Sequence, residues 1–149
     1  MCYACSTGTY NDVASATKCK NCSVGKYQNE TARTSCKACP AAKYLPAIAT
    51  QRSDISDCQD CSPGTYNDHT AAARCKNCTS GKYQNDTAST SCKACPVGKN
   101  LPAGAPRNDI NDCQDCLPGT YNDETAVAIC KVCTPGQYQN NTASTACTL

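Results

Sequence analysis

Cysteine is the residue whose type and spacing in this chain could do chemistry. The 149-residue sequence contains 17 cysteines, nearly all in Cys-x-x-Cys pairs, with thirteen residues between most successive pairs. Such pairs can form disulfides, bind zinc or carry out thiol redox reactions. A redox motif requires a helix N-terminus in a thioredoxin-like βαβ setting, and a zinc site requires cysteines grouped in fours. The sequence supplies neither, so we expect a disulfide scaffold.

The repeat itself predicts how the cysteines pair. In each Cys-x-x-Cys the second cysteine opens a module, and the first cysteine of the next pair closes it. Sequence alone does not fix connectivity, but this rule needs nothing beyond the repeat. Cys2 is left over, as expected if its partner lies upstream and the chain is a fragment of a longer repeat protein. The predicted disulfides are Cys5–Cys19, Cys22–Cys36, Cys39–Cys58, Cys61–Cys75, Cys78–Cys92, Cys95–Cys113, Cys116–Cys130 and Cys133–Cys147.

A longer period lies above the module. The modules follow one another in near-identical triplets, and the third member of each complete triplet is longer and contains Leu-Pro-Ala. A fixed period of this kind indicates a stacked array of small units. We expect residues 1–4 to end a truncated preceding module, and triplets to span 5–60, 61–115 and, in part, 116–149. Modules 1 to 8 are 5–21, 22–38, 39–60, 61–77, 78–94, 95–115, 116–132 and 133–149.

Glycine and tyrosine recur at fixed places in the modules. Glycine stands three residues after the opening cysteine except at Ala42, and tyrosine five residues after it except at Asn100. Gly-x-Tyr predicts a short strand leaving a glycine turn, and Ser/Thr-x-Cys-Lys a short returning strand. We expect the tyrosines to pack over disulfides, with an aromatic ligand-binding face as the alternative. They are Tyr10, Tyr27, Tyr44, Tyr66, Tyr83, Tyr121 and Tyr138.

These patterns define the expected fold class. No segment has an apolar period of 3.6 residues, so helix should be negligible. Phe and Trp are absent, and Leu, Ile, Val and Met together supply only fourteen residues. A chain with so little apolar material cannot build one large core, so disulfides must replace it. We predict a small disulfide-rich, minimal-β protein: an elongated linear array of about eight one-disulfide hairpin-like modules.

Five Asn-x-Ser/Thr sequons recur in phase with the repeat. Their recurrence favours N-linked glycosylation over the alternative that Asn and Thr simply suit a turn. One set lies in modules 2, 5 and 8. The other set abuts the half-cystine that opens a module, which would hinder the transferase. The predicted sites are Asn29, Asn85 and Asn140 in the first set, and Asn21 and Asn77 in the second.

Other polar residues do not form a catalytic constellation. The one histidine, His69, aligns with Val13 and Glu124 in the sister repeats, and no nucleophile–base arrangement surrounds it, so we do not expect an enzyme. A repeated run of aspartates could chelate calcium, with turns formed by the same side chains as the alternative. We expect no cofactor beyond covalent N-glycans, and calcium stays an open alternative. The aspartates are Asp54, Asp57, Asp60, Asp109, Asp112 and Asp115.

Charge and hydropathy exclude two further classes of partner. The net charge is +2 and the lysines are scattered once or twice per module, whereas a nucleic-acid surface needs clustered Lys and Arg. No stretch approaches the ~20 apolar residues of a membrane span. We therefore expect no nucleic-acid partner and no transmembrane segment in this chain.

Two segments carry a resemblance to a known family. Residues Cys61 to Asp68 and Cys116 to Asp123 read Cys-x-Pro-Gly-Thr-Tyr-Asn-Asp, and Cys-Lys-x-Cys follows each. This pattern resembles the ephrin-receptor-like cysteine-rich repeat and the one-disulfide module of tumour-necrosis-factor-receptor-type domains, and the likeness covers essentially the whole chain. It implies the same pairing, an elongated rod of small β modules and an extracellular setting. Similar runs occur in receptor ectodomains and in cysteine-rich surface coat proteins.

These observations predict a structural role outside the cell or at its surface, where disulfides persist. We expect a glycosylated, disulfide-laddered rod in a coat, stalk or filament, which self-associates or continues into a fibre. Near-identical triplets suit a spacer, because a ligand site usually needs a locally unique feature. The alternative is a receptor or adhesion stalk that binds a protein ligand along one face. An exposed apolar patch would favour it, and the candidates are Leu45, Ile48, Leu101 and Leu117.

Overall fold

The computed structural model describes residues 4–13 and 17–149 of the chain. Cys2 lies outside the described residues. The chain divides into two compact units, each of which is built from consecutive modules and short segments of the neighbouring ones. Unit 1 comprises Met1–Cys61, Asn67–Lys76 and Ala88–Thr90, and unit 2 comprises Ser62–Tyr66, Asn77–Thr87 and Ser91–Leu149.

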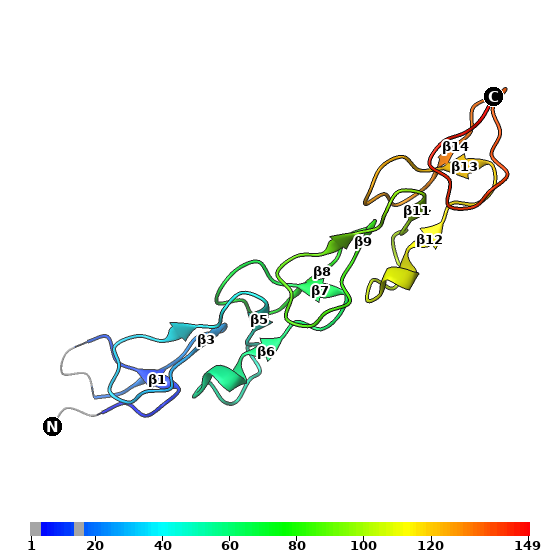
Figure 1. Ribbon diagram of the computed structural model, residues 1–149. Helices are drawn as coiled ribbons and strands as arrows, with labels where there is room; N and C mark the ends of the chain where they lie inside the picture. The colour runs from blue at the N-terminus through cyan, green and yellow to red at the C-terminus, as the bar shows by residue number, and fades with distance from the viewer. Residues whose placement is uncertain (1–3, 14–16) are drawn as a thin grey trace. The chain divides into compact units, whose positions relative to one another are not determined.

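Short antiparallel hairpins are the repeating element (Figure 1). The described residues contain seven hairpins, one in each of modules 1 to 7, and every strand has two residues. The pairs are β1 (Thr9–Tyr10) with β2 (Lys20–Asn21), β3 (Lys26–Tyr27) with β4 (Lys37–Ala38), β5 (Lys43–Tyr44) with β6 (Gln59–Asp60), β7 (Thr65–Tyr66) with β8 (Lys76–Asn77), β9 (Lys82–Tyr83) with β10 (Lys93–Ala94), β11 (Lys99–Asn100) with β12 (Gln114–Asp115), and β13 (Thr120–Tyr121) with β14 (Lys131–Val132). Module 8 has a single bridge between Tyr138 and Thr148 in the corresponding place.

The disulfide and the glycine turn set the hairpin register. The first strand begins directly after the glycine, as the sequence predicts. The returning strand begins at the last residue of the predicted one and continues inside the next Cys-x-x-Cys, because the residue after the closing cysteine pairs with the tyrosine, as in Tyr10 opposite Lys20. The minimal-β prediction and the prediction of a tandem array of disulfide-linked modules are both confirmed.

Helix is limited to two single 3-10 turns in the described residues, drawn as coils just before β6 and β12 in Figure 1. They are η1 (Ile55–Asp57) and η2 (Ile110–Asp112) in the long third modules. Each has a capping box, in which the aspartate before the turn accepts from a backbone N–H inside it and the last aspartate of the turn accepts from the backbone before it. The prediction of negligible helix is confirmed.

Backbone hydrogen bonds join successive modules at equivalent positions. The N–H of the glycine three residues after the opening cysteine donates to the carbonyl of the residue six positions after the next opening cysteine. In unit 1 the Gly8 N–H donates to the Gln28 carbonyl at 2.7 Å, and in unit 2 the Gly81 N–H donates to the Leu101 carbonyl at 2.9 Å. Other bonds of this type are Gly25 to Leu45, Ala42 to Asn67, Gly64 to Gln84, Gly98 to Asn122 and Gly119 to Gln139.

A second set of inter-module bonds comes from alanines with left-handed backbone. Ala32 has a φ of 56°, and its N–H donates to the carbonyl of Cys5, the cysteine that opens the preceding module, at 2.8 Å. The left-handed conformation is costly for a residue with a Cβ, so the surrounding contacts must impose it. The equivalent pairs are Ala71 with Cys39, Ala88 with Cys61, Ala126 with Cys95 and Ala143 with Cys116.

Glycine is required in three modules by a contact with the module two further along, and in one of them a Cβ on Gly98 would lie 2.2 Å from the Ala143 carbonyl oxygen. A Cβ on Gly25 would lie 2.0 Å from the Ala71 carbonyl oxygen in unit 1, and a Cβ on Gly81 would lie 2.0 Å from the Ala126 carbonyl oxygen in unit 2. All three glycines have φ above +70°, a region that L side chains disfavour. At these places each module therefore touches the next two modules of its unit.

Gly81→Ala and Gly119→Ala form a matched test of that contact. Both glycines have positive φ and donate the same inter-module hydrogen bond, but a Cβ on Gly119 meets nothing within 4 Å. Each alanine should cost about 1 kcal/mol for the left-handed backbone, and Gly81→Ala should cost about 1–3 kcal/mol more for overpacking.

Amide hydrogen exchange at Leu101, whose N–H donates to the Val127 carbonyl, measures the opening free energy near Gly81. Exchange at Asn122, whose N–H donates to the Ser144 carbonyl, serves the same purpose near Gly119. Equal losses of opening free energy in the two variants would show that the contact between Gly81 and Ala126 is not constraining.

The interior consists mainly of half-cystines and, in modules 2 to 7, of the residue six positions after the opening cysteine. In the third modules that residue is leucine: Leu45 is 1% exposed and Leu101 is fully buried. Two equivalent clusters result, one in each unit. The first contains Tyr27, Cys39, Leu45 and Cys58, and the second contains Tyr83, Cys95, Leu101 and Cys113.

Candidate functional site: the disulfide array and its exposed surface

Eight disulfides close the modules, and they are the same eight pairs that the repeat rule predicts. Six close loops with a sequence separation of 14, and the two in the long modules have separations of 19 and 18. All eight Cα–Cα distances lie between 5.7 and 5.8 Å, within the range usual for disulfides. Residues 4–13 and 17–149 contain no group of three or more His, Cys, Asp or Glu arranged to hold a metal ion.

The tyrosine stripe has three environments. Tyr27 and Tyr83 are each 7% exposed and pack on the half-cystines of the following module, such as the Cys39–Cys58 pair beside Tyr27. Tyr10, Tyr44, Tyr66 and Tyr121 are half-buried, and Tyr138 is exposed. Packing over a disulfide thus describes the second module of triplets 1 and 2, where the next module is a long one.

Buried amide side chains are the feature that the sequence reasoning missed. Asn67 is 1% exposed, and its Nδ2 donates to the carbonyls of Lys43 and His69 at 2.7 and 2.9 Å. Gln28 is 2% exposed and its Nε2 donates to the Ser35 carbonyl at 2.6 Å. Asn122 and Gln84 repeat these arrangements. The available signal was the recurrent Tyr-Asn or Tyr-Gln dipeptide, which places an amide where the third modules have leucine.

The aspartates considered as calcium ligands have partners within the protein. Asp57 accepts from the backbone N–H groups of Ser53 and Asp54 at 2.7 and 2.9 Å, and Asp54 accepts from the Ser56 N–H, which lowers its pKa. Asp109 and Asp112 repeat this arrangement, while Asp60 and Asp115 form ion pairs with Lys43 and Lys99. The structure thus shows the turn geometry that was the alternative to a calcium site.

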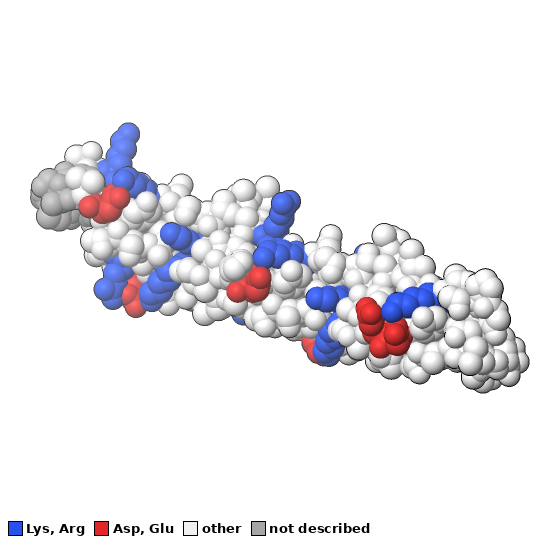
Figure 2. All heavy atoms as spheres, turned by 90° about the horizontal axis from the view of Figure 1, so that it is seen from above, with Lys and Arg blue, Asp and Glu red and all other residues white. Residues whose placement is uncertain are grey.

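Ion pairs recur across the hairpins of the first modules of the triplets. The Nζ of the lysine after the closing cysteine donates to the aspartate seven residues after the opening one: Lys20 to Asp12 at 2.7 Å, and Lys131 to Asp123 at 2.6 Å. These hydrogen bonds lower the pKa of Asp12 and Asp123. In the view of Figure 2, acidic side chains lie beside basic ones at several places on the surface.

Lys131→Gln should raise the pKa of Asp123 toward its ordinary value of 3.8, because its hydrogen bond from Lys131 is the main cause of the depression. The pair contributes stability above the unfolded-state pKa, and that contribution is lost as the pH falls through the depressed folded-state pKa. Carboxyl-detected NMR titration measures the shift, and Asp68, which keeps its partner Lys76, is the control. An unchanged Asp123 titration would contradict this assignment.

His69 is exposed, and its Nε2 lies 3.4 Å from the Asp68 carboxylate. The Asp68 carboxylate is also paired with Lys76 at 2.6 Å. The sister repeats have Val13 and Glu124 at this position. Exposure of the His69 imidazole explains why the position accepts such different side chains.

All five sequon asparagines are exposed. Asn29 and Asn85 lie just after β3 and β9, and their Oδ1 atoms accept from Lys37 and Lys93 at 2.7 and 2.6 Å. Asn21 and Asn77 end β2 and β8, next to buried half-cystines. The asparagines of both sets are therefore at the surface.

The candidate apolar patch needs correction. Leu45 and Leu101 are buried core residues and cannot contribute to a binding face, whereas Ile48 and Leu117 are 89% and 68% exposed. The sequence reasoning missed two further exposed residues of module 7. Ile129 and Val132 are 77% and 73% exposed.

Module 7 thus departs from its sister repeats. Leu117, Ile129 and Val132 occupy positions that are polar or charged in modules 1 and 4. The corresponding residues are Ser6, Lys18 and Asn21 in module 1, and Ser62, Arg74 and Asn77 in module 4.

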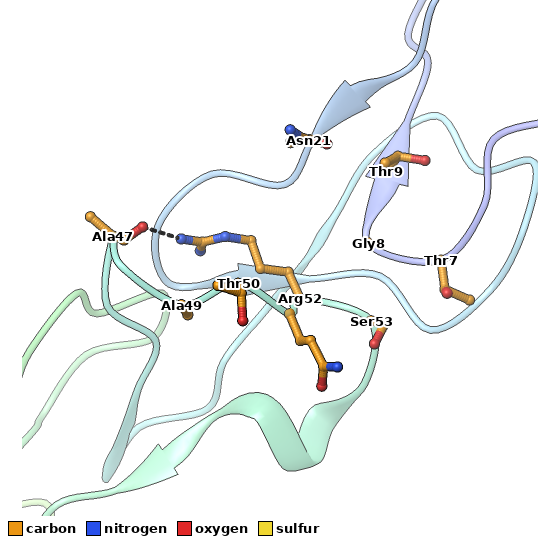
Figure 3. Close-up of a pocket in the computed structure, with 10 residues that line it drawn as sticks. Thr7, Gly8, Thr9, Asn21, Ala47, Ala49, Thr50, Arg52 and Ser53 are labelled. Atoms are coloured by element: carbon orange, nitrogen blue, oxygen red, sulfur yellow. Dashed lines mark hydrogen bonds between the residues drawn. The ribbon is translucent and has the colours of Figure 1, made fainter.

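Two hollows occupy equivalent places, one in each unit. The hollow in unit 1 has a volume of about 480 Å³ and lies between the β1 turn, Asn21 and the loop of module 3 (Figure 3). The Arg52 guanidinium forms part of its wall and donates to the carbonyls of Ser23, Pro46 and Ala47. The hollow in unit 2, of about 310 Å³, is lined among others by Gly64, Asn77 and Arg107.

The tandem, single-disulfide hairpins define the class of protein: a cysteine-rich repeat protein whose modules are closed covalently and joined by backbone hydrogen bonds. Residues 13–58 and 64–103 match the family model described as tyrosine-protein kinase ephrin type A/B receptor-like. The chain therefore belongs to the ephrin-receptor-like family of cysteine-rich repeats. No curated protein matches it.

Family and disulfide content together suggest an extracellular or secreted domain. Repeats of this kind are typically non-enzymatic. Within the described residues, no helix has the length and apolar character needed to span a membrane.

Proposed function

We propose that the protein is a structural extracellular repeat protein, a glycosylated, disulfide-laddered spacer in a surface coat, stalk or filament. The observation that carries the proposal is the use of equivalent positions in successive modules to bind the neighbouring modules. Three backbone N–H groups donate to a carbonyl of a neighbouring module: those of the glycine three residues after the opening cysteine, of the left-handed alanine and of the residue after the tyrosine. These bonds serve continuity of the array, which is what a spacer requires.

The disulfides would give such a spacer a fixed maximum length. A reduced 17-residue module extends to about 60 Å at about 3.5 Å per residue. With the disulfide intact, the path through a module is its Cα–Cα span of 5.7 Å plus three residue steps, about 16 Å in all. The covalent loop thus removes most of the extension that tension could otherwise produce.

Single-molecule pulling tests this mechanical role. Under oxidising conditions the chain should yield no more than about one quarter of its reduced contour length. Addition of a phosphine reductant should release the rest in steps of about 45 Å for a short module and about 60 Å for a long one. The Cys78→Ser, Cys92→Ser double variant should gain one such step without reductant. Full extension of the oxidised wild-type chain would contradict the proposal.

A second candidate function is a receptor or adhesion stalk that binds a protein ligand. The family itself suggests ligand binding, and the exposed Leu117, Ile129 and Val132 provide the broken repeat that this function would need. Contiguous patches of exposed apolar side chains mark interaction surfaces in soluble proteins. Self-association remains part of the first proposal and not of this one.

Electron microscopy of native material, before and after glycosidase treatment, separates the two functions. Uniform fibres or a continuous coat would support the spacer, whereas isolated molecules that each carry one partner would support the stalk. In the second case Leu117→Ser with Ile129→Arg and Val132→Gln should abolish capture of that partner. Glutamine is chosen at position 132 because asparagine would create a sequon there.

A further inference from the structure

The hollow in unit 1 has a lining that suits a neutral sugar, and the equivalent hollow in unit 2 offers Asn77 and Asn108 beside Pro63, Ala105 and Pro106. The hollow in unit 1 is lined by the hydroxyl-bearing residues Thr7, Thr9, Thr50 and Ser53, by Asn21 and Gln51, and by Ala47 and Ala49. The Thr9 hydroxyl donates to the Ser6 carbonyl, so it can only accept from a ligand. No carboxylate lines it, and its guanidinium is already bound to three carbonyls. Its volume of about 480 Å³ lies in the range of small-molecule sites. Such a lining offers donors, acceptors and apolar patches but no unpaired charge.

A sequon asparagine lies at the rim of each hollow. Asn21 in unit 1 and Asn77 in unit 2 are lining residues, both are exposed, and both begin an Asn-Cys-Ser/Thr sequon. The Asn29 and Asn85 side chains are held instead by Lys37 and Lys93 on the turns after β3 and β9. The two sets of sequons therefore offer an attached glycan different surroundings.

We propose that the glycans on Asn21 and Asn77 are seated, with the first N-acetylglucosamine of each lying in the hollow beside it. This inference rests on the proposed function, in which the protein is an extracellular glycoprotein. Tethering at the rim gives the sugar a high effective concentration at the wall, so weak polar contacts suffice to hold it. The seated sugar would connect the first module of a triplet to the long loop of the third.

The modification itself must precede closure of the neighbouring disulfide. The Asn21 Nδ2 attacks C1 of a lipid-pyrophosphate-linked oligosaccharide, the N–C1 bond forms, the C1–O bond to pyrophosphate breaks and one Nδ2 proton is lost to a base of the transferase. Cys22, the middle residue of the sequon, is 3% exposed and bonded to Cys36 in the folded chain. The sequon is accessible in extended form only before that bond closes.

Enzymatic release of the glycans from native protein tests the seating. The chain is expressed in a eukaryotic secretory host, and glycopeptide mass spectrometry follows peptide-N-glycosidase action at each site. We expect Asn21 and Asn77 to be occupied and to lose their glycans at least tenfold more slowly than Asn29 and Asn85. After reduction and denaturation the rates should become equal. Equal rates in the native protein would overturn the inference.

Slow release could also arise from the strand and disulfide beside Asn21, so a variant of the far wall is needed. Thr50→Phe fills the hollow of unit 1 without changing β2 or the sequon. It should accelerate release at Asn21 at least fivefold and leave release at Asn77 unchanged. If Thr50→Phe misfolds, NOEs between the acetamido methyl group and Ala49 or Thr50 in the wild-type protein decide the matter. Absence of these NOEs, or an unchanged Asn21 rate in folded Thr50→Phe, would overturn the seating.

Occupancy separates this inference from the proposed function. If Asn29, Asn85 and Asn140 carry glycans and Asn21 and Asn77 do not, the seating is wrong and the glycosylated spacer stands. If none of the five sites is occupied, both the seating and the glycoprotein character of the proposed function are wrong.

Discussion

Covalent loop closure is the constraint on which the rest of this structure depends. A disulfide that closes a loop of about fifteen residues removes about 3 kcal/mol of chain entropy from the unfolded state in the entropic model. Without that contribution, two-residue strands and an interior of half-cystines, amides and two leucines could not compensate the cost of ordering each residue. Once the loops are closed, the few remaining contacts only have to orient modules that are already compact.

Much of this architecture can be predicted from the sequence, because the repeat period determines where the disulfides and the first strands lie. The cysteine phase determines the pairing, and Gly-x-Tyr determines where the first strand starts. The period does not predict which polar residues are buried inside the modules. Asn67 and Gln28 are polar residues, which composition alone assigns to the surface, and they become buried because a carbonyl and an N–H meet each amide.

Two further features escaped prediction for opposite reasons. Alanine has no sequence signal for left-handed backbone, so the conformation of Ala32 and its counterparts appears only when the carbonyl of the preceding module is in place. Apolar residues are normally assigned to a core, so the exposure of Ile129 and Val132 emerges only from the fold. The lining of the hollow in unit 1 also comes from residues that are far apart in the sequence, such as Asn21 and Arg52.

The contact of Gly25 with Ala71, two modules away, and its counterpart between Gly81 and Ala126 have a consequence for how such a gene can change length. Removing or inserting one module would place a long third module where a short one now stands and would change which module lies two positions after each glycine. Recombination that deletes or inserts three consecutive modules leaves every remaining module next to neighbours of the same kind. Lineages should therefore grow and shrink this protein by whole blocks of 55 or 56 residues.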